Sequence, residues 1–330
     1  MKSCVVGIGA MGLEMALHIQ NKGMDVVGVD LDKKQIAEAK KRGLSASDDL
    51  ASQVSDIDVF IVIVATDKQT ESVVETVLNN SPKNGAAVVI AATNHPDTMK
   101  ALAPKCATAG VRFVDAPVVF GMQGARDGNL ASLCGGSEDD VSYVTPVLMC
   151  YSRAVHRVGG VGAGQLGKTC NNMMHWAACC ANFEVLALAK RYGVNAQHMR
   201  EILLECPARN TTLDRWDNTR FTWQEKDMDV AMELAQTAKL PLPLFGTIDQ
   251  LVKMFSADDV SALLYGEKAE YLGVDISAMK AQDRSLIVKS LRFSSWTLKA
   301  CVCFSVSSST EALQRRHVTS TLRSRPSVCI

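Results

Sequence analysis

Apolar and polar positions divide the chain into two parts with different periodicity. Over about the first 160 residues, short continuous apolar runs alternate with segments of helical spacing. Such runs are typical of strands buried on both faces, and strands alternating with helices predict a parallel, doubly wound sheet. Strands are expected at residues 3–7, 26–29, 58–64, 87–92, 111–114, 130–134 and 154–158, with helices that end near Lys22 and cover 35–41.

The pattern after Gly164 is helical only. No strand-like run is found from there to about Ser290, and apolar residues recur at the spacing of amphipathic helices. The predicted fold class is therefore α/β, with an N-terminal Rossmann doubly wound parallel sheet in residues 1–162 and an all-α C-terminal domain in residues 163–291. Helices of this second domain are expected at 165–192, 196–205, 228–239, 245–255 and 260–271.

Residues 292–330 form a third segment that differs in composition. From Ser294 onward it is rich in serine, carries four arginines and one acidic residue, Glu311, and shows no sustained period. We expect this tail to be disordered or loosely attached. An end of the chain with no role is an equally good interpretation of the same pattern.

Charge and composition exclude several classes of partner. The chain has 35 basic and 35 acidic residues, so no electrostatic attraction to nucleic acid or a membrane surface is expected. The apolar runs at 59–65 and 86–92 are shorter than the roughly 20 residues that a membrane-spanning helix needs. The length of 330 residues and the hydrophobic content of 47% suggest about two domains with large cores.

Cysteine usage points to a reducing compartment. The eleven cysteines show no C-x-x-C pair and no regular spacing, and several lie in apolar surroundings. We interpret them as reduced core residues of a cytoplasmic protein. The first strand begins almost at Met1, which leaves no room for a signal peptide, and no histidine cluster of the H-E-x-x-H kind predicts a metal site.

A glycine-rich turn follows the first expected strand. Gly7, Gly9 and Gly12 form G-x-G-x-x-G between a strand and a helix, the arrangement that holds the pyrophosphate of a dinucleotide at a helix N-terminus. Asp30 ends the second strand 18 residues after Gly12, where an acid accepts hydrogen bonds from the adenosine ribose. This favours NAD. Because Lys33 and Lys34 follow closely and could hold a 2′-phosphate, NADP stays open.

A second group of polar residues lies on the long helix expected after Gly164. Lys168 and Asn172 stand four residues apart and His175 three further on, so the three share one face. Burying a cation, an amide and an imidazole in one line on an apolar helix costs free energy unless these groups bind protein partners or a ligand. A solvated helix face is the simpler interpretation of a lone Lys–Asn pair, and a satisfied interior histidine that of His175 alone.

Four blocks make residues 1 to about 291 resemble the β-hydroxyacid dehydrogenase family, which includes 3-hydroxyisobutyrate dehydrogenase and tartronate semialdehyde reductase. The blocks are G-I-G-A-M-G at 7–12, D-A-P-V-V-F-G at 115–121, G-A-G-Q-L-G-K-T-C-N-N at 162–172 and K-D-M at 226–228. Shorter matches are Ala92-Thr93 and D-R-S-L-I at 283–287. The resemblance implies a homodimer or homotetramer acting on a small hydroxy acid or its semialdehyde.

The resemblance also implies roles for individual residues. Lys168 would exchange the proton with the substrate hydroxyl or carbonyl oxygen, and Asn172 would position that oxygen. Lys226 would face the cofactor. The residues expected to bind the cofactor are Gly7, Gly9, Ala10, Met11, Gly12, Asp30, Ala65, Thr93 and Lys226.

One block departs from the family pattern. The usual D-A-P-V-S-G-G has a serine and glycines that hold the substrate carboxylate, whereas this chain has Val119 and Phe120 before Gly121. The substitution removes a hydroxyl donor and adds a ring, which favours a substrate other than the usual short acids. Val119, Phe120, Gly121, Asn172 and His175 are the expected substrate-binding residues, with His175 partly replacing the serine. Phe120 pointing into the core is equally compatible with the pattern.

Two rival functions follow from the same residues. A reductase of another carbonyl or of an imine would fit the altered block, but imine-reducing relatives usually lack the lysine found at Lys168. A catalytically weak or inactive partner protein that binds NAD(P) would also tend to lose this lysine. Replacing Lys168 by Met separates an enzyme from a binding protein, because cofactor binding should survive while turnover collapses.

Overall fold

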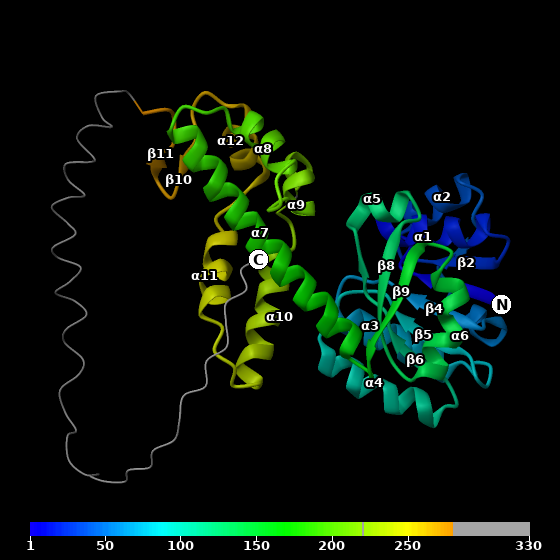
Figure 1. The fold of residues 1–330 in the computed structure, drawn as a ribbon. Coiled ribbons are helices and arrows are strands. Elements are labelled where there is room, and N and C mark those ends of the chain that lie inside the picture. The colour runs from blue at the N-terminus through cyan, green and yellow to red at the C-terminus, as the bar shows by residue number, and fades with distance from the viewer. Residues whose placement is uncertain (220, 280–330) are drawn as a thin grey trace, which may run out of the picture.

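The computed structural model describes residues 1–219 and 221–279. The tail of residues 292–330 and the block at 283–287 lie outside these residues, so the expectations for them stay predictions. The chain forms a nine-stranded sheet with helices on both faces, followed by a helical part around one long helix (Figure 1). Among the described helices, none combines the length and apolar character needed to cross a membrane.

The sheet confirms the expected doubly wound architecture and adds an antiparallel step. Its order is β3-β2-β1-β4-β5-β6-β8-β7, with β9 paired to β8, and all pairs from β3 to β6 are parallel. β8 runs antiparallel to β6 and β7, because the short connection through α5 cannot make the long crossover that parallel neighbours need. The strands are β1 (Lys2–Val6), β2 (Asp25–Val29), β3 (Ala46–Ser47), β4 (Val59–Val62), β5 (Ala87–Ile90), β6 (Arg112–Asp115), β7 (Val118–Val119), β8 (Leu130–Gly135) and β9 (Ser152–Gly159).

Two apolar cores fill the space between the sheet and its helices. One lies under α1, α2 and α6, and the other under η1, α3 and α4. Strands β1, β4 and β5 contribute to both cores, which is why their apolar runs are continuous. The helices are α1 (Ala10–Asn21), α2 (Lys33–Lys41), η1 (Ala51–Asp56), α3 (Asp67–Asn79), α4 (Pro96–Thr108), α5 (Gly121–Arg126) and α6 (Glu138–Leu148).

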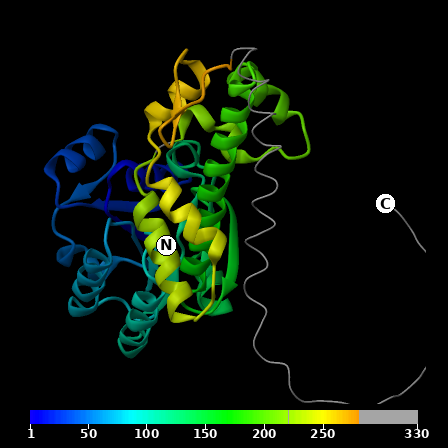
Figure 2. The same cartoon turned by 90° about the vertical axis from the view of Figure 1, so that its left-hand side faces the viewer.

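The helical part is built around α7, which begins on the sheet and runs through the whole of it (Figures 1 and 2). Trp176, Cys179 and Phe183 on one side of α7 form a third core with Trp216, Val252 and Leu263. The elements are α7 (Ala163–Arg191), α8 (Ala196–Leu204), α9 (Thr211–Asp214), η2 (Trp216–Asn218), α10 (Gln224–Thr237), α11 (Pro243–Val252) and α12 (Ala257–Tyr265).

The expectation that the second part contains no strands is wrong at its end. α12 stops at Tyr265, and β10 (Glu270–Tyr271) pairs with β11 (Val274–Asp275) in a small hairpin. Leu272 and Gly273 both have positive φ in the connecting turn, the combination that two-residue hairpin turns require. The L-G dipeptide between apolar residues was therefore the signal that the helical prediction overlooked.

Candidate active site

The glycine-rich turn has the geometry of a dinucleotide loop. Gly7 adopts φ 94°, and a Cβ on Gly12 would collide with the Gly7 carbonyl oxygen, so both glycines are required by the close packing of β1 and α1. A Cβ on Gly9 would meet no protein atom within 4 Å. Gly9 is therefore not needed for packing, and the space beside it is available to a ligand.

The start of α1 is suited to an anion. Gly9 occupies the N-cap position without a side-chain cap, and the first turn, with Ala10 and Met11, contains no acidic residue. The free N–H groups and the helix dipole therefore favour a phosphate at this point. At the neighbouring strand, Asp30 follows β2 and its Oδ1 accepts the N–H of Asp32 at 2.9 Å, which orients the carboxylate. These residues fit the pyrophosphate and ribose of a dinucleotide.

A buried carboxylate anchors the start of α7. Asp115, at the end of β6, accepts the N–H of Gly162 at 2.7 Å and that of Gln165 at 2.9 Å. Gly162, the N-cap residue, has no side chain, so Asp115 caps the helix from another element. Burial raises the pKa of Asp115, while these backbone N–H donors act in the opposite direction.

The anchor continues into the loops that follow β4 and β5. The Gln165 amide donates to Ala92 O at 2.8 Å and accepts the Asn94 N–H at 2.9 Å. Asn94 in turn donates to Asp67 at 2.9 Å. Burial opposes ionisation of Asp67, but hydrogen bonds from Thr98, Asn94 and the His95 N–H outweigh it and lower its pKa. This network sets the position of α7 relative to both loops.

Lys168 reaches from α7 to β7. Its Nζ donates to the carbonyl oxygen of Val118 at 2.9 Å. Burial lowers the pKa of Lys168, and the nearby carboxylate of Asp227 acts in the opposite direction. The lysine is thus a largely buried amine held beside the D-A-P-V-V-F-G block.

Asn172 and Asp227 lie on facing helices next to Lys168. Asn172, on α7, is 9% exposed and its side chain hydrogen-bonds the carboxylate of Asp227 on α10. Trp176 donates its indole N–H to the same carboxylate at 3.1 Å. Burial raises the pKa of Asp227, and the hydrogen bonds together with the charges of Lys168 and Lys226 oppose this. Asp227 therefore contacts the polar line of α7 rather than serving as a helix cap.

Lys226 joins the helical part to two loops of the N-terminal sheet domain. Its Nζ donates to Ala65 O after β4 and to Thr93 O after β5, both at 3.1 Å. One α10 side chain thereby bridges the two loops at the carboxyl ends of neighbouring parallel strands, where ligands of doubly wound folds bind. Ala65, Thr93 and Lys226, far apart in sequence, meet at this edge.

His175 has protein partners at both ring nitrogens. Nδ1 lies 3.0 Å from Thr212 Oγ1, and Nε2 lies 3.9 Å from Cys179 Sγ. Burial, followed by the charge of Lys168, lowers the pKa of His175 to about 4, so the ring is neutral near pH 7. The structure thus places His175 on the same face as Lys168, but with its nitrogens turned to the helical part.

The loop after β7 has an unusual backbone at its central residue. Phe120 adopts φ 84° and ψ 3°, a left-handed conformation that costs a residue with a Cβ about 1–2 kcal/mol. Gly121 follows with φ 60°. The Phe120 ring packs against the core beneath α1 and lies under the guanidinium of Arg153, 4.0 Å from its Cζ. Val119 pairs with Ala131 in the sheet.

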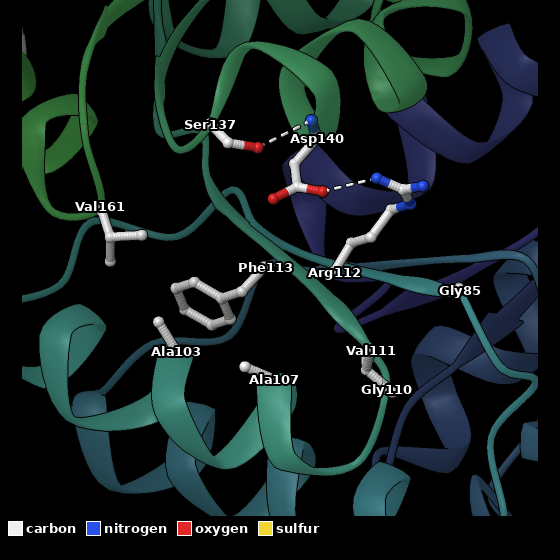
Figure 3. Close-up of a pocket in the computed structure, with 10 residues that line it drawn as sticks. All are labelled: Gly85, Ala103, Ala107, Gly110, Val111, Arg112, Phe113, Ser137, Asp140 and Val161. Atoms are coloured by element: carbon white, nitrogen blue, oxygen red, sulfur yellow. Dashed lines mark hydrogen bonds and ion pairs between the residues drawn. The ribbon is translucent and has the colours of Figure 1, made fainter.

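The cavity drawn in Figure 3 is separate from the residues described above. It has a volume of about 420 Å³ and lies between α4, β6 and the start of α6, with the Arg112–Asp140 ion pair on one side (Figure 3). None of the residues expected to bind cofactor or substrate lines it. Within residues 1–219 and 221–279, no group of three or more His, Cys, Asp or Glu residues is arranged to hold a metal ion.

Four polar residues of the anchor were not among the expected site residues. Asp115 and Gln165 lay inside recognised blocks, but they were not assigned a role, and Asp67 and Asn94 carried no motif. A buried Asp directly after an apolar strand was the one available signal. The partners of these residues lie 27 to 73 positions away, so sequence spacing could not pair them.

Family models match most of the chain. Residues 2–160 match the NAD binding domain of 6-phosphogluconate dehydrogenase, and residues 162–264 match the NAD-binding domain of NADP-dependent 3-hydroxyisobutyrate dehydrogenase. The fold and these matches define an NAD(P)-dependent oxidoreductase with a Rossmann domain and a helical partner domain. The chain belongs to the β-hydroxyacid dehydrogenase family, which confirms the resemblance seen in the sequence.

Individual relatives agree with this assignment. The chain is 27% identical over 281 residues to 2-(hydroxymethyl)glutarate dehydrogenase of Eubacterium barkeri, covering 78% of this chain and 92% of the relative. It is 24% identical to 3-hydroxyisobutyrate dehydrogenase of Pseudomonas aeruginosa, covering 83% and 96%. The solved structure of Mycobacterium tuberculosis 3-hydroxyisobutyrate dehydrogenase with L-serine superposes with a TM-score of 0.71 at 23% identity, covering 80% of this chain and 98% of that one.

Proposed function

We propose that this enzyme interconverts a small 3-hydroxy acid and its semialdehyde or keto form, with Lys168 as the proton-transfer group. The observation that carries the proposal is the placement of a buried lysine beside the 115–121 block, on a helix whose start is anchored by Asp115 of the same block. Relatives named for hydroxy acids, such as 3-hydroxyisobutyrate and 2-(hydroxymethyl)glutarate, support the substrate class.

Lys168 supplies the acid–base chemistry. In oxidation its neutral amine takes the hydroxyl proton, and a nicotinamide cofactor held by the glycine-rich loop at 7–12 would supply the hydride acceptor for the same carbon. In reduction its ammonium donates a proton to the carbonyl oxygen. The lowered pKa favours this role, because a general acid–base group works best when its pKa lies near the working pH.

Asn172 and Asp227 complete the polar face. The Asn172 amide is oriented by Asp227 and by the Asn171 amide, and the second N–H of its Nδ2 can donate to the substrate oxygen and hold it at a fixed distance from Lys168. The negative charge of Asp227 opposes the effect of burial on Lys168 and keeps its pKa from falling too far. Asn172 is therefore assigned to substrate positioning, and Asp227 to tuning the lysine.

The cofactor that these residues favour is NAD. Gly7, Gly9 and Gly12 with the start of α1 would hold the pyrophosphate, and Asp30 would accept hydrogen bonds from the ribose hydroxyls. Asp32, whose carboxylate caps α2 by accepting the Lys34 N–H at 2.8 Å, adds a second negative charge nearby. Two carboxylates disfavour a 2′-phosphate, although Lys33 and Lys34 keep NADP as the alternative.

The decisive experiment is a turnover screen that follows reduced-nicotinamide absorbance. The panel contains 3-hydroxyisobutyrate, glycerate, threonate and 2-(hydroxymethyl)glutarate, each with NAD and with NADP. Lys168→Met should lower kcat by roughly 100-fold to 10,000-fold, the usual contribution of a general acid–base group, while NAD binding survives. Lys100→Met, at an exposed position of α4, is the matched control and should retain full turnover.

Two outcomes would contradict the proposal. If the wild-type protein binds NAD but turns over no hydroxy acid of the panel, the non-catalytic partner protein becomes the better interpretation. If Lys168→Met retains activity, another group transfers the proton, as a reductase of a different carbonyl or imine would require.

We also propose a homodimer or homotetramer. Met174, Val185 and Leu188 of α7 are exposed, and their spacing places them on one side of the helix, away from the core side chains Trp176 and Phe183. An apolar stripe on a central helix is the kind of surface that subunits bury. Light scattering of the wild type and of Leu188→Glu tests this: a monomeric wild type would exclude the proposal.

A cytoplasmic location is the last part of the proposal. All eight cysteines within the described ranges are free, which suits a reducing compartment. Subcellular fractionation with compartment markers tests it, and recovery with mitochondrial markers would contradict it. A mitochondrial form is named for several relatives, including those of Mus musculus and Homo sapiens.

A further inference from the structure

The loop after β7, within the 115–121 block, contains a strained aromatic residue, Phe120, that no packing requirement of the sheet explains. Phe120, with φ 84°, occupies a conformation that glycine adopts freely and that a side chain makes costly. Backbone strain of this kind persists only when surrounding contacts hold it, and it concentrates at functional sites. The contacts that hold Phe120 therefore bear on what the loop binds.

Arg153 is the contact above the ring. Its guanidinium carbon lies 4.0 Å from the ring centroid, well within the range of a cation–π interaction. Arg153 is exposed, and within the ranges 1–219 and 221–279 its guanidinium has no ion pair or hydrogen bond. A guanidinium placed over a ring without other partners keeps N–H donors free, and these donors can bind a carboxylate in bidentate fashion.

An irregularity in the β8–β9 pairing directs the Arg153 side chain toward Phe120. Leu130 pairs with Ser152 and Ala131 with Ala154, so Arg153 is the extra residue where the β8–β9 register shifts. Such bulges re-aim a side chain and are common beside active sites. Ala131 also pairs with Val119 on its other side, so the bulge lies two strands from the loop, and the long arginine side chain crosses β8 to reach Phe120.

We propose that Arg153, held on Phe120, selects a hydroxy acid that carries a second carboxylate, which rests on the proposed reaction at Lys168. Lys168 contacts Val118 O, and the two residues from there to Phe120 span at most about 7 Å. The Phe120 side chain and the 4.0 Å from ring to guanidinium add to this span, so the cation lies within roughly 15 Å of Val118. A second carboxylate on a longer chain extends further from the reacting carbon than the carboxylate of a short 3-hydroxy acid, so it is the group better placed to meet this cation.

The test compares two probe substrates in wild type and variants. The probes are 2-(hydroxymethyl)glutarate, which has two carboxylates, and 3-hydroxyisobutyrate, which has one. Arg153→Ala should raise KM for the dicarboxylate by roughly 10-fold to 100-fold, the effect of losing a hydrogen-bonded charge pair. For the monocarboxylate the KM should change by a smaller factor, because that substrate loses only the support that Arg153 gives to Phe120 and no hydrogen-bonded charge pair.

Two further variants make the result specific. Arg157→Ala removes the same charge from the same strand, where the guanidinium contacts Gly136 O and Glu138, and should change neither KM. Arg153→Lys keeps the charge but loses the planar fork, so it should recover part of the dicarboxylate affinity. Thermal unfolding of each variant shows whether the fold is retained.

The outcomes separate this inference from the proposed function. Equal changes for both probes, or no change for either, in Arg153→Ala would overturn the selection of a dicarboxylate while turnover of the monocarboxylate leaves the proposed function standing. A wild type that turns over only the monocarboxylate would overturn it too. If the wild type turns over neither probe and no other acid of the panel, the proposed function itself fails.

Discussion

The Nζ of Lys168 donates to the carbonyl oxygen of Val118 at 2.9 Å, joining α7 to β7. The two residues are 50 positions apart, and Asp115, three residues before Val118, caps the same helix. The anchor of the helix and the contact of its lysine therefore come from one short segment. Any movement of this segment changes both the position of Lys168 and its surroundings.

The pH dependence should have opposite signs in the two directions. Oxidation needs the neutral amine of Lys168, so its rate should rise with pH through the lowered pKa of this group, and reduction should fall over the same range. In Asp227→Asn the carboxylate no longer raises the Lys168 pKa, so the oxidation limb should shift to lower pH. Profiles of kcat/KM measure this. Asp229→Asn, an exposed change on the same helix, should leave the profile in place.

The cap of α7 should couple stability to catalysis. Asp115→Asn keeps the shape but turns an amide donor toward backbone N–H groups, so we expect a loss of about 1–3 kcal/mol in the free energy of unfolding. Because Lys168 lies one turn further along the helix, kcat should also fall, by roughly 10-fold to 100-fold.

The matched control for this prediction is another helix cap. Ser137 caps α6 through the Asp140 N–H at 3.0 Å, away from the substrate loop. Ser137→Ala should cost about 1 kcal/mol of stability and leave kcat unchanged. Urea unfolding and steady-state kinetics measure both effects, and a normal kcat in Asp115→Asn would show that the cap does not position Lys168.

Two glycines of the loop should separate folding from cofactor binding. A Cβ at Gly9 meets no protein atom, so Gly9→Ala should change stability by no more than about 1 kcal/mol yet weaken NAD binding by roughly 10-fold or more. Gly12→Ala pushes α1 away from the Gly7 carbonyl, so it should lose about 1–3 kcal/mol of stability as well. Calorimetric titration with NAD and thermal unfolding test the pair, and normal NAD affinity in Gly9→Ala would contradict the cofactor assignment.

His175 should make the protein sensitive to mild acid. Its pKa is lowered from 6.5 to about 4 in the folded state, so the unfolded state binds the proton more tightly. Stability from this group is present above the unfolded pKa and is lost as the pH falls from 6.5 towards 4, amounting to about 2 kcal/mol at pH 5.

The difference between wild type and His175→Leu in urea unfolding at pH 7.5 and pH 5 isolates this effect. The variant should lose less stability than the wild type between the two pH values. His198→Gln, at an exposed histidine near Glu201, should behave as the wild type does. An equal acid response of wild type and His175→Leu would mean that His175 does not titrate in this window.

The amino-acid sequence by itself determined the architecture and the type of cofactor. Continuous apolar runs can be satisfied only by strands buried on both faces, and alternation with helices specifies a parallel sheet. Glycine spacing predicts the dinucleotide loop, because steric limits on the backbone act within a few residues. The one face shared by Lys168, Asn172 and His175 follows likewise from the helical repeat.

Only the tertiary structure decided which distant groups meet. Asp115 caps α7, Lys226 bridges Ala65 and Thr93, and Asp227 faces Asn172, although these partners lie 47 to 161 positions apart or on separate helices. The antiparallel step at β8, the direction of the Phe120 ring and the partners of His175 were equally open in the sequence. Such contacts depend on how elements pack across the sheet, and local spacing carries no information about that packing.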